Sequence, residues 1–164
     1  MIFITVGTHE QPFDRLLKYI DNMIESKVIT EKVICQKGFT NYESKNFSAK
    51  KLISYEEMQE NIKSARIVIT HGGPASFIDA LKYGKIPIVV PRKKEFNEHV
   101  NNHQVEFSKE VEKRMKNILV EENEEELLEC VVNYEEKIRN LNKDTSSNNS
   151  KFNGELLKQI EKLF

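Results

Sequence analysis

The sequence predicts an α/β fold: a Rossmann-like parallel sheet of about six strands with helices on both faces. Short apolar runs alternate along the chain with helical patterns. These runs are almost continuously apolar, which is typical of parallel strands buried on both faces. The length of 164 residues, with 38% hydrophobic and 31% charged residues, suits one globular domain with its own core.

The first half of the chain is assigned from apolar periodicity and from capping signals. Pro12 opens a helix whose apolar residues recur on one face. Ser54 and Glu57 have the spacing of a capping box, so a short helix is expected from there to Ala65. No helical period follows the second strand, and an irregular connection is expected there. The strands are expected at 2–6, 32–36 and 51–54.

The second half repeats the alternation. Strands are expected at 66–70, 86–90 and 117–120, and helices up to Gly84, over 98–113 and over 123–139. The last of these helices is expected to turn five apolar residues inward: Leu127, Leu128, Val131, Val132 and Ile138. The domain is then residues 1–140, followed by a polar linker at 141–151 and an amphipathic helix at 152–164.

Two glycine-bearing turns are expected to meet at one point of the sheet. With a strand order of 3-2-1-4-5-6, the topological switch lies between the first and fourth strands. The segment Gly7-Thr8-His9 follows the first of them, and His71-Gly72-Gly73-Pro74 follows the fourth. Because ligands of open α/β sheets bind in this crevice, both turns are candidates for one site.

The second turn, between strand and helix, favours a phosphate site. Its small residues leave backbone N–H groups free to meet a phosphate, and Ser76 adds a hydroxyl. An ordinary strand-to-helix turn is the alternative. The G-x-G-x-x-G fingerprint is absent and no Walker lysine follows, so nicotinamide cofactors and ATP hydrolysis are both disfavoured.

Polar residues near these turns extend the candidate site. Thr8 and the first-turn amides would complete a phosphate-binding cradle, with His9 toward a diphosphate or a sugar hydroxyl; a structural turn is the alternative. Asp79, one helical turn beyond Ser76, suits the hydroxyls of a ribose, or else complements the helix dipole.

His99 and His103 are expected one turn apart on a single helix face. The order H-E-x-x-H is absent and no third ligand is evident, which disfavours zinc. His103 and Gln104 suit neutral hydrogen bonds to a sugar, and a solvated helix face is the alternative. The loop Arg92-Lys93-Lys94 would attract an anionic substrate or simply lie in water.

Composition excludes several other classes. A net charge of −1 gives no general attraction to nucleic acid. The only two cysteines, Cys35 and Cys130, are expected as buried thiols. No stretch reaches the ~20 apolar residues of a membrane span. A cytoplasmic protein is expected, with any membrane contact peripheral.

Four segments together resemble the C-terminal domain of family 28 glycosyltransferases. The chain is most similar to the small PssE/EpsF-type subunits of bacterial exopolysaccharide and capsule synthesis, which are related to the cytosolic subunit of the dolichol-linked N-acetylglucosamine transferase. The likeness covers about residues 1–120. The segments are V-G-T-H-E-Q-P-F-D-R-L, I-T-H-G-G-P-A-S, G-K-I-P-I-V-V-P-R and E-H-V-N-N-H-Q.

The resemblance implies one domain of the GT-B C-terminal type that binds a UDP-sugar without a metal or other cofactor. It implies that His71, Gly72, Gly73 and Ser76 hold the diphosphate, that Asp79 binds ribose, and that His103 and Gln104 touch the sugar. Glu98 lies in the same motif. No catalytic base is evident from the residues, and His9 is the one weak candidate.

The resemblance further implies a partner. Similar subunits act with a membrane-anchored subunit that binds the acceptor and would supply the general base. The expected reaction transfers a hexose such as galactose to an undecaprenyl-diphosphate-linked sugar at the inner face of the membrane. Two alternatives stay open: a non-catalytic enhancer or scaffold of a partner transferase, and a nucleotide-sensing module.

Overall fold

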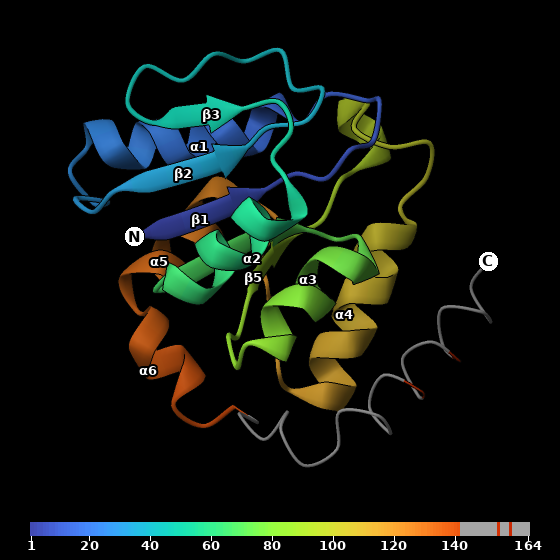
Figure 1. Ribbon diagram of the computed structural model, residues 1–164. Coiled ribbons are helices and arrows are strands. Elements are labelled where there is room, and N and C mark those ends of the chain that lie inside the picture. The colour runs from blue at the N-terminus through green and yellow to red at the C-terminus, as the bar shows by residue number, and fades with distance from the viewer. Residues whose placement is uncertain (142–153, 155–157, 159–164) are drawn as a thin grey trace.

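The computed structural model describes residues 1–141, Gly154 and Lys158. Their sheet has six parallel strands, as predicted, in the order assumed for a Rossmann-like fold, β3-β2-β1-β4-β5-β6 (Figure 1). The predicted linker and tail helix lie almost wholly outside the described residues. The strands are β1 (Ile2–Thr5), β2 (Val33–Gln36), β3 (Ser48–Lys50), β4 (Ile67–His71), β5 (Ile88–Val90) and β6 (Leu119–Val120).

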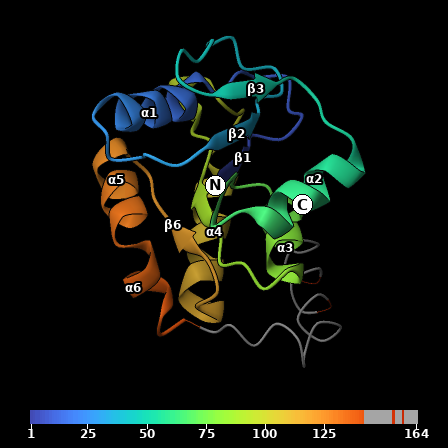
Figure 2. The same ribbon diagram turned by 60° about the vertical axis from the view of Figure 1, so that its left-hand side comes forward.

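Helices cover both faces of the sheet, which gives three layers (Figure 2). A short 3-10 helix, η1 (Lys94–Phe96), follows β5. One face carries α1 (Asp14–Glu25), α5 (Glu124–Val132) and α6 (Tyr134–Ile138). The other carries α2 (Tyr55–Ser64), α3 (Pro74–Lys82) and α4 (His103–Met115).

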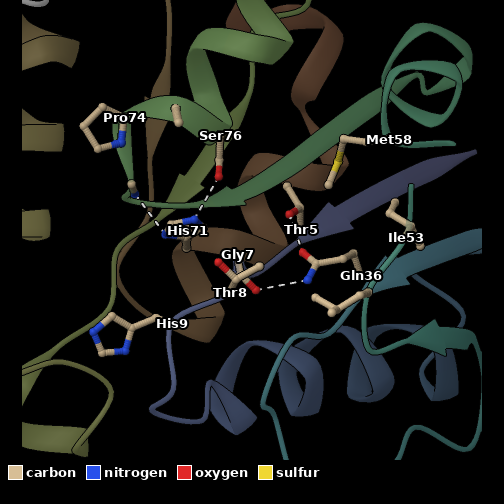
Figure 3. Close-up of a pocket in the computed structure, with 13 residues that line it drawn as sticks. Thr5, Gly7, Thr8, His9, Gln36, Ile53, Met58, His71, Pro74 and Ser76 are labelled. Atoms are coloured by element: carbon tan, nitrogen blue, oxygen red, sulfur yellow. Dashed lines mark hydrogen bonds between the residues drawn. The ribbon is translucent and has the colours of Figure 1, made fainter. Parts of the chain in front are cut away.

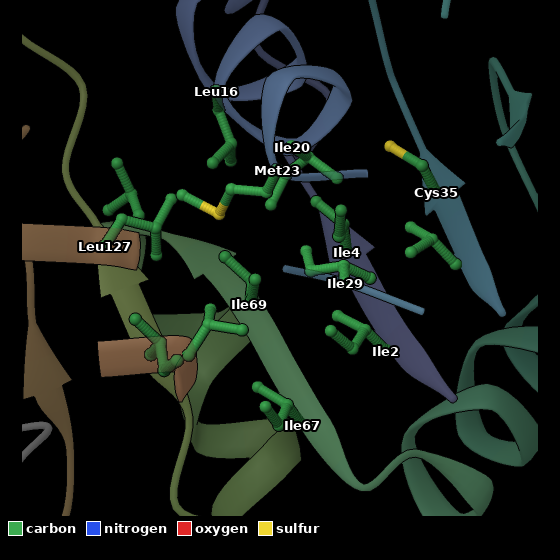
Figure 4. Packing of buried hydrophobic residues seen from close by; sticks show 14 of the residues in the cluster. Ile2, Ile4, Leu16, Ile20, Met23, Ile29, Cys35, Ile67, Ile69 and Leu127 are labelled. Atoms are coloured by element: carbon green, nitrogen blue, oxygen red, sulfur yellow. The ribbon is translucent and has the colours of Figure 1, made fainter. Parts of the chain in front are cut away.

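Alternation along each strand fills both layers. Ile2 and Ile4 of β1 face the layer of α1 and α5 and belong to the same core cluster as Met23 and Leu127 (Figure 4). Phe3, between them in sequence, packs on the opposite face with residues of α2 and α3. The strands are therefore buried on both sides, which is why they are almost continuously apolar.

The predicted boundaries of the third strand and of the helix expected over 98–113 are wrong. The third strand is Ser48–Lys50, not 51–54. It is a polar edge strand without an apolar signal, and the chain leaves it so that Ser54 can cap α2, accepting from the Glu57 N–H as the capping box predicts. The helix expected from Glu98 begins only at His103, because Glu98 is buried in an ion pair with Arg15.

The helix predicted over 123–139 is in fact two, α5 and α6, separated at Asn133. The break turns Tyr134 into the core, where its hydroxyl donates to the Ile86 carbonyl over 2.7 Å. Leu128 and Val132 were expected inside but are exposed, with 36% and 60% of their surface accessible. The periodicity had assigned too wide an apolar face to this helix.

Two further expectations concern thiols and membrane spans. Cys35 and Cys130 are free and buried, as predicted. Among the residues that the structure describes, no helix combines the length and apolar character needed to cross a bilayer.

Candidate functional site

A cavity of about 520 Å³ opens at the carboxyl edge of the sheet, between the ends of β1 and β4 (Figure 3). Thr5 of β1 pairs with Thr70 of β4, so Gly7 and Gly72 each lie two residues past the same rung. The two turns therefore meet, as the strand order predicts. Their end of the cavity is polar, and the opposite end is an apolar wall formed by Leu52, Ile53 and Met58.

His71 lies at the centre of the polar end. Its Nδ1 accepts the N–H of Gly73 over 3.0 Å, and its Nε2 lies 2.8 Å from Oγ of Ser76. Because Nδ1 accepts, the uncharged ring carries its hydrogen on Nε2 and donates it to Ser76. Burial and the nearby Arg92 lower the pKa of His71 to about 3, so the ring is neutral at pH 7. Ser76, in turn, keeps its own hydrogen for an acceptor in the cavity.

Glycine is required on both sides of this ring. Gly7 has a φ of +75°, and a Cβ there would lie 2.5 Å from Nε2 of His71. A Cβ on Gly73 would lie 2.1 Å from Cε1 of the same ring. Any larger residue at either position would displace His71, so the two turns and the imidazole form one packed unit.

Two amide groups expected to be free for a phosphate are already used. Gly72 donates its N–H to Oε1 of Gln104 over 3.1 Å, and Gly73 donates to His71. The expectation fails at both glycines because neighbouring side chains satisfy the turn internally. Within residues 1–141, the N–H groups of Thr8 and Ala75 make no hydrogen bond, and both residues line the cavity.

A buried arginine ties the surrounding loops together. Arg92 is wholly buried, although its loop was expected to lie in water or attract substrate. Its guanidinium donates to the carbonyls of Val6 over 2.8 Å, of Gln11 over 2.7 Å and of Glu98 over 3.2 Å. Its own N–H donates to Oε1 of Gln104. Burial lowers the pKa of Arg92 to about 10, which leaves it charged at neutral pH.

Gln36 fixes the apolar wall relative to the glycine turn. Thr5 donates its hydroxyl to Oε1 of Gln36 over 2.7 Å. Nε2 of Gln36 then donates to the carbonyls of Gly7 over 3.0 Å and Lys51 over 3.1 Å. Because Lys51 directly precedes the wall, one side chain sets the spacing between the polar and apolar ends of the cavity.

The sequence pattern of the glycosyltransferase family 28 C-terminal domain matches residues 1–160. The chain belongs to this family. No curated protein sequence is similar enough to this one to count as a relative.

Solved glycosyltransferases resemble the family 28 domain in fold. SnogD from Streptomyces nogalater is 14% identical with a TM-score of 0.52, over 85% of this chain and 39% of its own. VinC, solved in complex with dTDP, is 15% identical with a TM-score of 0.48, over 98% and 41%. The glycotransferase of kitacinnamycin is 15% identical with a TM-score of 0.47, over 80% and 34%. The chain thus spans well under half the length of each.

In the family 28 domain, most of the predicted site residues line two cavities on either side of the turn that follows β4. The main cavity is lined by Gly7, Thr8, His9, His71, Gly73 and Ser76. A second cavity of about 70 Å³ lies on the other side of the same turn and is lined by Gly72, Gly73, Pro74, His99, His103, Gln104 and Phe107.

Asp79 and Glu98 line neither of these two cavities. The carboxylate of Asp79 accepts from Nζ of Lys82 over 2.8 Å. Glu98 is buried, and Arg15 donates to both of its carboxylate oxygens, over 2.8 and 2.9 Å. The N–H of Lys93 donates to it as well. In this arrangement Glu98 holds the loop that leads to α4.

Sequence reasoning missed Gln36 and gave Arg92 a different role, in water or toward an anionic substrate. Gln36 is the polar last residue of the otherwise apolar strand β2, and that position was the available signal. His99 precedes α4, so it does not share a helix face with His103 as predicted. Among the described residues, no three His, Cys, Asp or Glu side chains are grouped so that they could hold a metal ion.

Proposed function

We propose that this chain is the donor-binding half of a two-component, inverting glycosyltransferase and that its ligand is a UDP-sugar. One observation carries the proposal: in a family 28 domain, the cavity at the switch point joins a polar turn to an apolar wall. A nucleoside diphosphate has the same two parts, an anionic group and a flat ring system. The cavity volume of about 520 Å³ lies in the range that small-ligand sites occupy.

The parts of the ligand are assigned by chemistry. The base lies against Leu52, Ile53 and Met58, and the diphosphate meets the hydroxyl of Ser76 and the N–H of Ala75 in the first turn of α3. The positive end of this helix stabilises the leaving UDP without a metal ion. In this proposal the sugar enters the small cavity beside His103 and Gln104, and the ribose draws Asp79 away from Lys82.

A second subunit completes the enzyme in this proposal. Five exposed large apolar side chains follow the carboxyl ends of β2, β3 and β5, on the edge of the sheet where the cavity opens. In the part of the chain described, the other exposed large apolar side chains are Leu128 and Val132, which lie on α5 away from this edge. Such a surface around a polar site suits protein contact. The edge residues are Phe39, Leu52, Tyr55, Phe96 and Val100.

The partner in this proposal is membrane-anchored. It presents an undecaprenyl-diphosphate-linked sugar, supplies the general base and keeps the donor half at the inner face of the membrane. The donor is then a hexose, with galactose as the first candidate, and the product is an exopolysaccharide or capsule precursor.

Calorimetry tests the donor-binding role directly. The chain, alone and with its partner, should bind UDP, UDP-galactose and UDP-N-acetylglucosamine, whereas ATP should not compete. If neither preparation binds any uridine nucleotide, the protein is better described as a scaffold of a partner transferase. Binding without transfer by the complete pair would favour nucleotide sensing.

Asp79→Ala tests the ribose assignment. The substitution should weaken UDP binding about tenfold, since it removes an acceptor for two hydroxyls. Lys82→Ala is the matched control, because it frees the Asp79 carboxylate from its ion pair and should leave UDP affinity equal or higher. An Asp79→Ala affinity equal to that of the wild type removes the ribose role.

A further inference from the structure

Three histidines around the site share one hydrogen-bond pattern. In each, Nδ1 accepts the backbone N–H of the residue two positions later. The distances are 3.1 Å from Gln11 to His9, 3.0 Å from Gly73 to His71, and 3.4 Å from Asn101 to His99. These histidines follow β1, end β4 and follow β5, so three separate loops repeat the arrangement.

This pattern fixes which ring nitrogen carries the hydrogen. An Nδ1 that accepts an N–H is unprotonated, so the uncharged ring has its hydrogen on Nε2. His71 donates that hydrogen to Ser76. Within the described residues, Nε2 of His9 makes no hydrogen bond, and the ring of His99 interacts with Asn101 of its own loop.

His9 and His99 form a pair. Their ring centroids are 4.8 Å apart and the rings are inclined by 37°. Arg92 holds both loops, because it donates to the carbonyls of Val6 and Gln11 on either side of His9 and to the carbonyl of Glu98 next to His99. The pair is therefore positioned by a buried side chain and needs no ligand to assemble it.

The pair lies where the two cavities adjoin. His9 lines the main cavity at the end opposite Met58 and Ile53 (Figure 3). His99 lines the small cavity on the other side of the Gly73-Pro74 turn. A nucleotide-sugar that spans both cavities passes this junction with the phosphate nearer its sugar.

We propose that His9 and His99 act together as Nε2–H donors to the second phosphate of a nucleoside diphosphate. The proposal rests on the proposed function and adds a subsite to it. It also assigns His9 a donor role in place of a general-base role. A base needs a free lone pair, and the Nδ1 lone pair of His9 already accepts from Gln11.

The charges around His99 favour an uncharged ring before the ligand binds. Arg92, His71 and His103 are the cationic or titratable groups near His99, besides His9 itself. The nearest carboxylate in sequence, that of Glu98, is turned to Arg15. Burial, His9 and Arg92 lower the pKa of His99, which keeps its ring neutral at pH 7.

The test compares UDP with UMP, which lacks the second phosphate. His9→Phe and His99→Phe keep a ring but lose the donor, and each should weaken UDP binding about tenfold while leaving UMP binding within about twofold. His9→Gln and His99→Gln restore an amide Nε2 donor and should stay within about threefold of wild type. Thermal melting confirms that each variant is folded.

Two further readouts bear on the proposal. Nitrogen-15 spectra of histidine-labelled protein at pH 7.5 should show His9, His71 and His99 with hydrogen on Nε2, and a hydrogen on Nδ1 of His9 or His99 overturns the assignment. UDP affinity should stay level from about pH 7 to 9, because the lowered pKa of His99 leaves its ring already neutral at pH 7.

The proposal is also overturned if the phenylalanine variants lose UDP and UMP binding equally, or if neither variant loses UDP binding. If the wild type binds no UDP, the proposed function fails instead, and the spectra still decide the tautomers.

Discussion

The two ends of the main cavity are built in opposite ways. At the polar end, His71, Gln104 and Arg92 are joined by hydrogen bonds to three loops, and the glycines leave no spare volume. At the apolar end, Leu52 is 58% exposed, and Ile53 and Met58 are half-buried against the core. The polar end is therefore formed before any ligand arrives, whereas Leu52 at the apolar end gains burial only when something covers it.

This difference is what a phosphate-and-base ligand requires. Hydrogen bonds to a phosphate depend on donor positions fixed within a fraction of an ångström, so the donors benefit from rigid support. Apolar contact with a flat base is non-directional and scales with the area covered. A site with one fixed end and one open end can hold the diphosphate in a defined position by hydrogen bonds, and the base can enter without any rearrangement of the protein.

Removing Arg92 should have the largest effect on the fixed end. Arg92→Met leaves the carbonyls of Val6, Gln11 and Glu98 without a donor in a buried region, which should cost about 3 kcal/mol of unfolding free energy. Urea denaturation measures it. Arg66→Met is the control, since Arg66 is 43% exposed in its ion pairs and should lose less than about 1 kcal/mol. Similar losses in the two variants would contradict the role given to Arg92.

The neutral state of His71 should appear as a pH dependence of stability. Its pKa is about 3 in the folded protein and near 6.5 in the unfolded chain. The unfolded state alone binds a proton between these values, so stability is complete above pH 6.5 and falls as pH decreases. The loss should be about 1.4 kcal/mol per unit, or about 2 kcal/mol by pH 5.

His71→Asn keeps an acceptor for the Gly73 N–H but does not titrate in this range. Denaturation curves at pH 7.5 and 5.0 should therefore differ less for the variant than for the wild type. Equal pH dependence in the two proteins would mean that His71 is not held neutral by its surroundings.

The sequence located the strands and helices because apolar strands and helical stripes are local patterns. The meeting of the two turns then followed from the strand order assumed for a Rossmann-like sheet. The edge strand Ser48–Lys50 and the start of α4 could not be predicted, since the first has no apolar signal and the second depends on the distant pair of Arg15 with Glu98.

The sequence predicted which residues line the site, but it did not predict the contacts between them. His71, Gly73 and Ser76 do line the cavity, but the sequence offered no means of knowing that His71 would occupy the space beside both glycines. Arg92 shows the same limit: three basic residues in a row favour a solvated loop, and only its partners in Val6, Gln11 and Glu98 explain its burial.

A pair of glycine substitutions measures how tightly the fixed end is packed. Gly7 and Gly84 both have positive φ, +75° and +68°, so alanine costs about 1 kcal/mol of backbone strain at either. Beside Gly84 nothing lies within 4 Å, whereas a Cβ on Gly7 meets His71 at 2.5 Å. Gly7→Ala should thus lose about 1 kcal/mol more than Gly84→Ala in denaturation, and it alone should lose UDP binding. If both alanines cost the same, the ring has room to move and the fixed end is looser than described.

The open end should respond to substitution in affinity and not in stability. Leu52→Ala removes apolar surface from the wall, and it should weaken both UMP and UDP binding about threefold because the base loses contact area. Unfolding free energy should stay within about 0.5 kcal/mol of wild type, since the side chain is already largely in water. Val132→Ala, at a residue 60% exposed on α5, is matched in exposure and should change neither quantity. A stability loss at Leu52 would show that the wall is packed like the polar end, and the contrast between the two ends would disappear.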